Sequence, residues 1–478
     1  MSSRSPFAQA TATLLCYGWL ACAATAAVAQ KLPSCNPNLT RFDAALHPSP
    51  GGAGVTLHNT HQRSRLQAGI DRDELRRLQV EWALLANPPM SLPFSAAGVV
   101  FSGSGDGGVY AVDPTSGCVR WRFQAQSGPT TSIGVTDWSG DQFGVQRPLA
   151  YFADDQARVY VLDMLTGQLL WSRPVSDHQN ATITGAPVYF EERLFVPVAF
   201  ANPDATRTSS PVIALAIGDG DIQWKLDGEN APVAGGVRHS PVVDAQRDLL
   251  VFATDAENGA IVSANLSSGR RVWTYRPESP ARFVGGITLT TSREGSQLIV
   301  VGDDQGVVHA VAAEDGALVW RKQLSHGTAH AALRTAMASD NERIYVPLTI
   351  GSNSQETSGI AALAALDLLT GQQVWSSPAT NLCQQGAPCA PGIDSAAFLV
   401  DGVIVGGHMD GRLIAYDGAD GSVFHREDFA SRTFSTLSGG QATLTQFTGG
   451  GISADNGRVF ATGVTVDGRG ILLSLRPR

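Results

Sequence analysis

The chain has 478 residues, of which 43% are hydrophobic and only 16% are charged, and its formal net charge at pH 7 is −9. An acidic protein repels the phosphate backbone, so this balance argues against a nucleic-acid partner. The 51 glycines and 25 prolines favour many short strands joined by turns over long helices.

The N-terminal 29 residues have the layout of a cleavable secretory signal peptide. Their single charge is Arg4, and the apolar stretch "ATATLLCYGWLACAATAAVA" ends in the small residues expected before a cleavage site between Ala29 and Gln30. A lipoprotein signal cleaved before Cys22 is the alternative, although Trp19 stands where such signals carry a small aliphatic residue. No later stretch is long and apolar enough to span a bilayer. We therefore predict a periplasmic or secreted protein.

Four cysteines follow the predicted signal peptide, and an even number in an exported chain predicts disulfides. Cys383 and Cys389 enclose the short, turn-rich loop "QQGAP", so we expect them to pair with each other. Cys35 and Cys118 then pair by elimination, although four cysteines allow three connectivities. Zinc is the competing explanation, but no histidine lies within a few residues of the 383–389 loop, so we do not expect a zinc site there.

A recurring pattern along the chain predicts a series of β-hairpins. Each copy alternates apolar residues, turns at a glycine and ends in an aromatic residue four places later. The final positions lie 47 to 55 residues apart, and a further short apolar strand precedes each copy. The seven copies are "VYAVDPTSGCVRW" (109–121), "VYVLDMLTGQLLW" (159–171), "VIALAIGDGDIQW" (212–224), "IVSANLSSGRRVW" (261–273), "VHAVAAEDGALVW" (308–320), "LAALDLLTGQQVW" (363–375) and "LIAYDGADGSVFH" (413–425).

Repeats of about fifty residues, each forming one four-stranded sheet, predict an all-β, eight-bladed β-propeller. The eighth blade is split: "GILLSLRPR" at the C-terminus supplies half of a hairpin, and "LQVEWAL", which contains Trp82, supplies the other half. Pairing of these strands would close the ring. We thus predict a signal peptide over 1–29, an extension over 30–50 and a single propeller domain over 51–478. The repeated tryptophans are interpreted as packing between blades.

The blade motif, in outline "VYALD…TG…W", resembles the repeat of pyrroloquinoline-quinone (PQQ) propellers, and the chain is most similar to the polyvinyl alcohol dehydrogenase branch of that superfamily. The similarity extends from about Gly51 to the C-terminus and includes "LHNTHQ" (57–62), "DHQNATITGAP" (177–187) and the Gly117-Cys118 turn. The resemblance implies a periplasmic quinoprotein. In that family PQQ, held with calcium in the central funnel, oxidises an alcohol and passes electrons to a cytochrome c.

The chain departs from the family pattern at five elements of the cofactor shell, so we expect an eroded PQQ and calcium site and identify no catalytic residue. There is also no Cys-x-x-Cys-His motif, which argues against a covalent haem domain. The departures are "TRTSSPVIAL" (206–215) in place of a paired-cysteine segment, Arg238 in place of the tryptophan platform for the quinone, 254–256 in place of the calcium-binding asparagine motif, "TYRPESPARF" (274–283) without the catalytic aspartate, and Thr130 and Asp304 near or at the positions of two basic residues.

Three groups of residues remain candidates for a metal site. They are Asp255, Glu257 and Asn258 at the family's calcium position, the acidic pairs Asp154-Asp155 and Asp303-Asp304, and His326 with His330. Each group has a plainer interpretation. Acids and amides suit hydrophilic turns, where they cap backbone N–H groups, and a histidine spacing of four has meaning only on a helix.

Arg238, His239 and Asp304 are the candidates for ligand contacts inside the funnel. The resemblance implies that Arg238 and His239 point inward, where a cation in place of an aromatic platform would suit an anionic ligand. We therefore prefer a binding or accessory protein for a small anionic or alcohol ligand. One alternative is a divergent PQQ-dependent alcohol dehydrogenase served by a separate cytochrome c. Another is an envelope scaffold, similar in logic to the lipoprotein propeller that helps assemble outer-membrane barrels.

Overall fold

The computed structural model describes residues 32–37, 41–46, 56–138, 147–200, 211–226, 235–324, 333–348, 361–378 and 392–478. They belong to one compact unit that extends from Leu32 to Arg478. The predicted signal peptide, the Cys383 and Cys389 pair, and His326 with His330 lie outside the described residues and stay predictions. Within the described ranges, no helix has the length and apolar character needed to cross a membrane.

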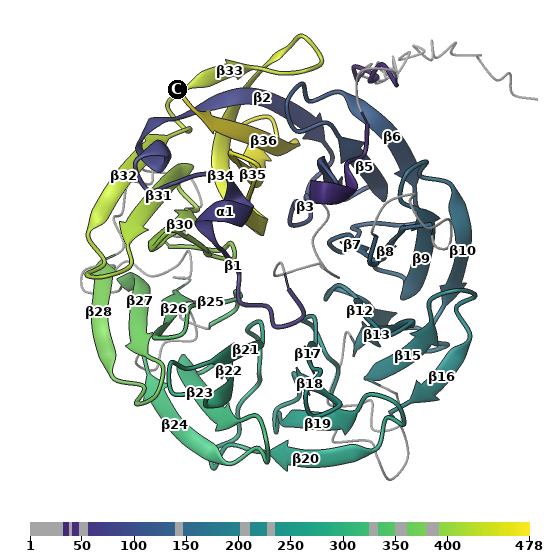
Figure 1. Ribbon diagram of the computed structural model, residues 1–478, viewed down its shortest axis with the longest axis vertical. Coiled ribbons are helices and arrows are strands. Elements are labelled where there is room, and N and C mark those ends of the chain that lie inside the picture. Colours follow the sequence, from purple (N-terminus) through teal and green to yellow (C-terminus); the bar gives the residue numbers. More distant parts are fainter. Residues whose placement is uncertain are drawn as a thin grey trace, which may run out of the picture. The chain divides into compact units, whose positions relative to one another are not determined.

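Eight β-sheets follow one another around a ring, which confirms the predicted eight-bladed propeller (Figure 1). The first seven blades each contain four antiparallel strands, and β1 (Gln62–Arg63) adds a fifth, parallel strand to the sheet of blade 7. Blade 1 is β3 (Phe94–Ala96), β4 (Val99–Gly103), β5 (Gly108–Val112) and β6 (Val119–Gln124); blade 2 is β7 (Gly134–Val135), β8 (Leu149–Ala153), β9 (Arg158–Asp163) and β10 (Leu169–Pro174); blade 3 is β12 (Val188–Phe190), β13 (Arg193–Pro197), β15 (Val212–Ala216) and β16 (Ile222–Lys225). Two further short strands, β11 (Ala181–Thr182) and β14 (Ala199–Phe200), form a separate two-stranded sheet.

The next four blades repeat this order. Blade 4 is β17 (Val242–Asp244), β18 (Leu249–Ala253), β19 (Ile261–Asn265) and β20 (Arg271–Tyr275); blade 5 is β21 (Thr288–Thr291), β22 (Gln297–Gly302), β23 (Val307–Ala312) and β24 (Leu318–Gln323); blade 6 is β25 (Ala338–Ser339), β26 (Arg343–Pro347), β27 (Ala361–Asp367) and β28 (Gln373–Pro378); blade 7 is β29 (Phe398–Val400), β30 (Val403–Gly407), β31 (Arg412–Asp417) and β32 (Val423–Asp428). Middle strands such as β4 and β5 are buried along their whole length, because neighbouring blades cover both faces of the sheet.

Blade 8 closes the ring from both ends of the propeller. It combines β33 (Thr433–Ser435), β34 (Gln441–Asp455), β35 (Arg458–Thr465) and β36 (Gly470–Pro477) with β2 (Leu78–Ala86), which comes from the N-terminal side. Strands β2 and β36 are antiparallel, with Leu78 opposite Pro477 and Ala86 opposite Gly470. Figure 1 shows the purple β2 beside the yellow β36. The predicted pairing of "LQVEWAL" with "GILLSLRPR" is confirmed.

Seven tryptophans join successive blades at seven of the eight boundaries of the ring, and the blade 7 repeat ends in His425 instead. Each indole Nε1 donates to a backbone carbonyl of the following blade's hairpin turn at 2.8 to 3.2 Å, and the turn glycine lies against the indole ring. The glycine and the tryptophan of the sequence repeat are therefore partners across blade boundaries. The pairs are Trp82 with Gly117, Trp121 with Gly167, Trp171 with Gly220, Trp224 with Gly269, Trp273 with Gly316, Trp320 with Gly371 and Trp375 with Gly421.

Short elements lead from the extension to the ring-closing strand. They are η1 (Ala44–Leu46), β1 (Gln62–Arg63), α1 (Arg65–Ala68) and η2 (Glu74–Arg77). Helix α1 begins at a capping box, in which Ser64 accepts from the Gln67 amide and the Gln67 side chain accepts from the Ser64 amide. This cap fixes the point at which the chain turns away from the centre of the ring towards β2.

A disulfide between Cys35 and Cys118 ties the extension to blade 1, which confirms the pairing reached by elimination. The backbone of the extension also continues the edge of that blade. The Val119 amide donates to the Pro33 carbonyl at 2.7 Å, and the Cys35 amide donates to the Val119 carbonyl at 3.1 Å. The edge of β6 is therefore covered over this short stretch.

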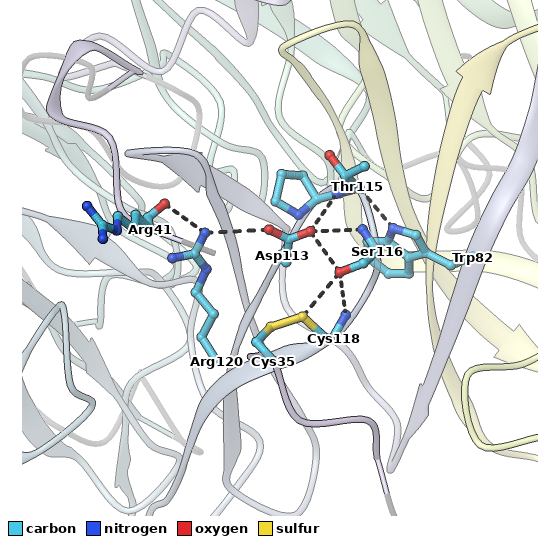
Figure 2. Close-up of polar contacts among 9 residues, drawn as sticks. Cys35, Arg41, Trp82, Asp113, Thr115, Ser116, Cys118 and Arg120 are labelled. Carbon is cyan, nitrogen blue, oxygen red and sulfur yellow. Dashed lines mark hydrogen bonds and ion pairs between the residues drawn. A yellow bond between two sulfur atoms is a disulfide. The ribbon is translucent and has the colours of Figure 1, made fainter. Parts of the chain in front are cut away.

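The same hairpin turn of blade 1 receives the ring-closing strand (Figure 2). Trp82 of β2 donates to the Pro114 carbonyl at 2.9 Å. Asp113 caps the turn, and Arg120 lies 3.5 Å from Asp113 while donating to the Arg41 carbonyl at 2.8 Å. The Cys35–Cys118 disulfide and the hydrogen bond from Trp82 thus both stabilise the same hairpin turn of blade 1.

We expect the double variant Cys35→Ser/Cys118→Ser to unfold more easily than the parent. The two cysteines lie 83 residues apart in sequence. A disulfide that closes a loop of this size reduces the conformational entropy of the unfolded chain, which typically raises the free energy of unfolding by about 2–4 kcal/mol. Denaturant titration of both proteins, with and without dithiothreitol, measures the difference. Equal midpoints for the oxidised parent and the variant would contradict the prediction. Any effect of reductant on the double variant reports the predicted Cys383–Cys389 pair separately.

Candidate functional site

A short N-terminal segment, Leu57–Arg63, runs past the innermost strands of four successive blades; we call it the strap. Its carbonyl groups accept one amide from each of these strands at 2.9 to 3.0 Å. The donor and acceptor pairs are Val243 to Leu57 in blade 4, Leu289 to His58 in blade 5, Ser339 to Thr60 in blade 6 and Leu399 to His61 in blade 7. In addition, β1 pairs in parallel with β29.

The strap needs an unusual backbone to serve successive blades. Asn59 has φ 53° and His61 has φ 47°, both in the left-handed region, so the carbonyl groups around them can turn towards different blades. Asparagine tolerates this conformation well. The side-chain amide nitrogen of Asn59 donates to the carbonyls of Ser240 at 3.2 Å and Ile287 at 3.3 Å. The two residues therefore fix the strap and present polar groups at the centre of the ring.

Arg63 anchors the far end of the strap to blades 8 and 1. Its guanidinium forms an ion pair with Asp455 of β34 and donates to the Ser95 carbonyl of β3 at 3.3 Å. The side chains of Arg63 and Asp455 are only 6% and 14% exposed. Burial raises the pKa of Asp455 to about 6, although the Arg63 charge acts in the opposite direction.

A cavity of 280 Å³ lies between the strap and the segments that precede the innermost strands. Asn59 and His61 line it from the strap, and each of the eight blades, or the link that leads into it, contributes further side chains or glycines. The polar residues of the lining include His61, His239, Arg334, Thr335 and Asp394. Because the cavity is assembled from segments far apart in sequence, it exists only in the closed ring.

Burial keeps the two histidines of the cavity uncharged at neutral pH. It lowers the pKa of His61 to about 4, and it also lowers the pKa of His239, whose Nε2 donates to the Val284 carbonyl at 2.7 Å. Burial raises the pKa of Asp394, opposed by the nearby charge of Arg334. Among the described lining residues, Arg334 is the single permanent cation and its side chain is exposed.

The predicted funnel residues Arg238, His239 and Asp304 lie in different surroundings. His239 lines the cavity, but the Arg238 guanidinium forms an ion pair with Asp255, which is 2% exposed. Asp304 accepts from the Arg282 amide at 2.9 Å. Its role and that of the Arg238–His239 pair in ligand binding stay predictions.

The residues at the family's calcium position do not fit a calcium ion. Asp255 already accepts from the Gly236 amide at 2.8 Å and pairs with Arg238, while Glu257 and Asn258 are exposed. A cation at Asp255 would have to displace the guanidinium. In the described ranges, no group of three or more histidine, cysteine or acidic side chains is placed to hold a metal.

The first acid of each pair in blades 2 and 5 acts as a turn cap. Asp154 accepts from the amides of Gln156 and Arg158 and from the Tyr160 hydroxyl at 2.7 Å. Asp303 makes the same backbone contacts in blade 5, with His309 in place of the tyrosine at 2.9 Å. These bonds support the plainer interpretation for Asp154 and Asp303.

Sequence reasoning missed Arg334, Thr335 and Asp394, as well as the part that the strap plays. The only signal for the strap was the family-like "LHNTHQ" segment. Arg334 and Thr335 lie in "LRTAM" (333–337) and Asp394 lies in "GIDSA" (392–396), and nothing in the local sequence distinguishes these segments from other links between blades. Their convergence on one cavity depends on the ring.

Comparisons with known proteins agree with this architecture. The PQQ_2 family profile, described as "Outer membrane protein assembly factor BamB", matches residues 105–284 and 257–466. Polyvinylalcohol dehydrogenase from Pseudomonas sp. is 27% identical over 487 residues, covering 90% of this chain and 75% of that protein. BamB from Yersinia pestis is 26% identical over 268 residues, covering 53% and 62%.

Solved structures share the fold at low sequence identity. Quinohemoprotein alcohol dehydrogenase from Comamonas testosteroni superposes with a TM-score of 0.67 at 15% identity, covering 92% of this chain and 82% of that chain. BamB from Moraxella catarrhalis superposes with a TM-score of 0.53 at 14% identity, covering 82% and 98%. The profile match spans more than half of the sequence, and the chain therefore belongs to the PQQ_2 family of PQQ-type β-propellers.

Proposed function

We propose that this chain is an exported binding propeller that has kept the PQQ-type fold and lost the PQQ and calcium shell. The observation that carries the proposal is the Arg238–Asp255 ion pair. The family resemblance implies that the quinone would stack at Arg238 and that calcium would lie near Asp255, and the ion pair engages both of these side chains. The cavity beside the strap is the proposed binding site for a small anionic or alcohol ligand. The signal-peptide sequence supports a periplasmic or secreted location.

A direct test incubates the purified protein with PQQ and calcium, removes free cofactor, and records the absorption spectrum. The treated protein is then assayed with alcohols, including polyvinyl alcohol, and an artificial electron acceptor. Polyvinylalcohol dehydrogenase from Pseudomonas sp. is the positive control. We expect no retained quinone and no turnover. Stoichiometric quinone with turnover would overturn the proposal and establish a divergent dehydrogenase, the alternative that the 27% identity to that enzyme favours.

A second candidate function is an envelope scaffold, which the BamB profile and the Yersinia pestis BamB match favour. A scaffold predicts a stable protein partner. Affinity purification from the solubilised envelope, followed by gel filtration, separates the two functions, because a scaffold elutes as a stoichiometric complex and a ligand-binding propeller elutes alone.

A further inference from the structure

The charge of the cavity selects the kind of anion that it can hold. Arg334 is the single permanent cation among the described residues that line the cavity, and Arg238, outside that lining, pairs with Asp255. The carboxyl group of Asp394 lies near enough to feel the Arg334 charge. A single guanidinium with a carboxyl group nearby matches a singly charged carboxylate better than a multiply charged phosphate.

Two residues that line the cavity each carry a buried polar atom with no hydrogen-bond partner in the described part of the chain. The atoms are Nδ1 of His61, a side chain from a residue that is 5% exposed, and Oγ1 of Thr335. Buried polar atoms are normally satisfied, and an unsatisfied one is costly. A ligand hydroxyl can both donate and accept, so it pairs with either tautomer of the imidazole and either orientation of the threonine hydroxyl.

The size and composition of the cavity limit the ligand further. Its 280 Å³ is near the lower end for small-molecule sites. Its described lining contains no phenylalanine, tyrosine or tryptophan, so it offers no broad surface on which a sugar or aromatic ring would stack. These properties favour a short, flexible aliphatic molecule.

We propose that the central cavity binds a small aliphatic hydroxycarboxylate, with Arg334 holding the carboxylate and with His61 and Thr335 contacting ligand hydroxyl groups. The inference rests on the proposed binding function and names its ligand class. The strap becomes part of the binding site, because it supplies His61. The same segment that joins blades 4 to 7 thus carries a ligand contact.

Isothermal titration calorimetry without PQQ or calcium tests the inference with matched probes. D-gluconate is compared with hexanoate, which lacks the hydroxyl groups, and with xylitol, which lacks the carboxylate; L-lactate and propionate form a smaller pair. We expect gluconate to bind at least tenfold more tightly than hexanoate or xylitol. Equal affinity for gluconate and hexanoate, or for gluconate and xylitol, would overturn the inference.

Variants assign the contacts. Arg334→Gln is expected to lower gluconate affinity at least tenfold, whereas Arg270→Gln, an exposed arginine in a blade 4 turn, leaves it unchanged. His61→Asn keeps a residue that tolerates the left-handed backbone, and we expect it to weaken gluconate at least threefold while leaving hexanoate unaffected. Circular dichroism melts confirm that each variant is folded. Unchanged gluconate affinity in folded Arg334→Gln would overturn the assignment.

Failure of this inference and failure of the proposed function give different results. If neither hydroxy acid binds and the protein also retains no quinone, the ligand class is wrong while the loss of the PQQ shell stands. If the protein retains quinone and turns over alcohols, the proposed function is wrong, whatever the calorimetry shows.

Discussion

Replacing Gly371 with alanine is expected to destabilise the propeller by about 3 kcal/mol. Gly371 has φ 68°, which costs a residue with a side chain about 1 kcal/mol, and the new Cβ would lie 2.5 Å from Cδ2 of Trp320. Overpacking of this kind adds about 1–3 kcal/mol. Denaturant titration measures the sum. Gly295→Ala is the matched control, because Gly295 also has a positive φ of 87° but no atom within 4 Å of the added Cβ.

The partner residue gives the second half of this test. Trp320→Ala removes a buried indole and its 2.8 Å hydrogen bond to the Leu368 carbonyl, so we expect a loss of about 3–5 kcal/mol. In the Trp320→Ala background the Gly371→Ala change meets no indole and should cost only its backbone contribution. Strict additivity of the two changes would contradict the inter-blade contact as the reason for the repeated glycine.

Replacing Arg63 with alanine is expected to cost about 3–5 kcal/mol at pH 8. The change leaves the Asp455 carboxylate buried without its cation and removes the bond to the Ser95 carbonyl. It also frees the end of the strap. Arg65→Ala is the control, since Arg65 forms an exposed pair with Asp71, and such pairs contribute about 0.2–1 kcal/mol.

The cost of Arg63→Ala should fall as the pH is lowered. Burial already raises the pKa of Asp455 to about 6 beside Arg63, and loss of the cation raises it further. A folded-state pKa above the unfolded value means that the folded protein binds the proton more tightly, so lowering the pH through that pKa stabilises the fold. We expect a smaller difference between variant and parent at pH 5 than at pH 8. A difference that is constant or larger at pH 5 would contradict the role of Asp455.

Much of the propeller could be predicted because its determinants are local and repeated. The alternating residues and turn glycine of each copy specify a hairpin, and a period near fifty residues specifies a blade. The half-hairpins at 78–86 and 470–477 were recognisable because each lacked its complement, and they do pair. The Cys35–Cys118 pairing followed by elimination once the short loop between Cys383 and Cys389 had suggested their pairing, and it is confirmed.

The candidate site could be predicted less well from the sequence, because its residues lie in links between blades that carry no repeating pattern. The alignment drew attention to Arg238, yet its charge is taken up by Asp255, seventeen positions further along the chain. Arg334 and Asp394 gave no signal at all, and His61 belonged to a segment noted only for its family likeness. Individual side chains could be named from the sequence, but their partners could not.

The sequence by itself determined the eight blades, their tryptophan and glycine boundaries and the closing strand pair, because strand alternation and turn chemistry act over a few residues. Only the tertiary structure decided what lies at the centre. The strap crosses four blades through backbone carbonyls, which any residue provides, and the cavity is lined by seven separate links. Such contacts are set by where the closed ring brings distant backbone together, so residue identity along the chain does not reveal them.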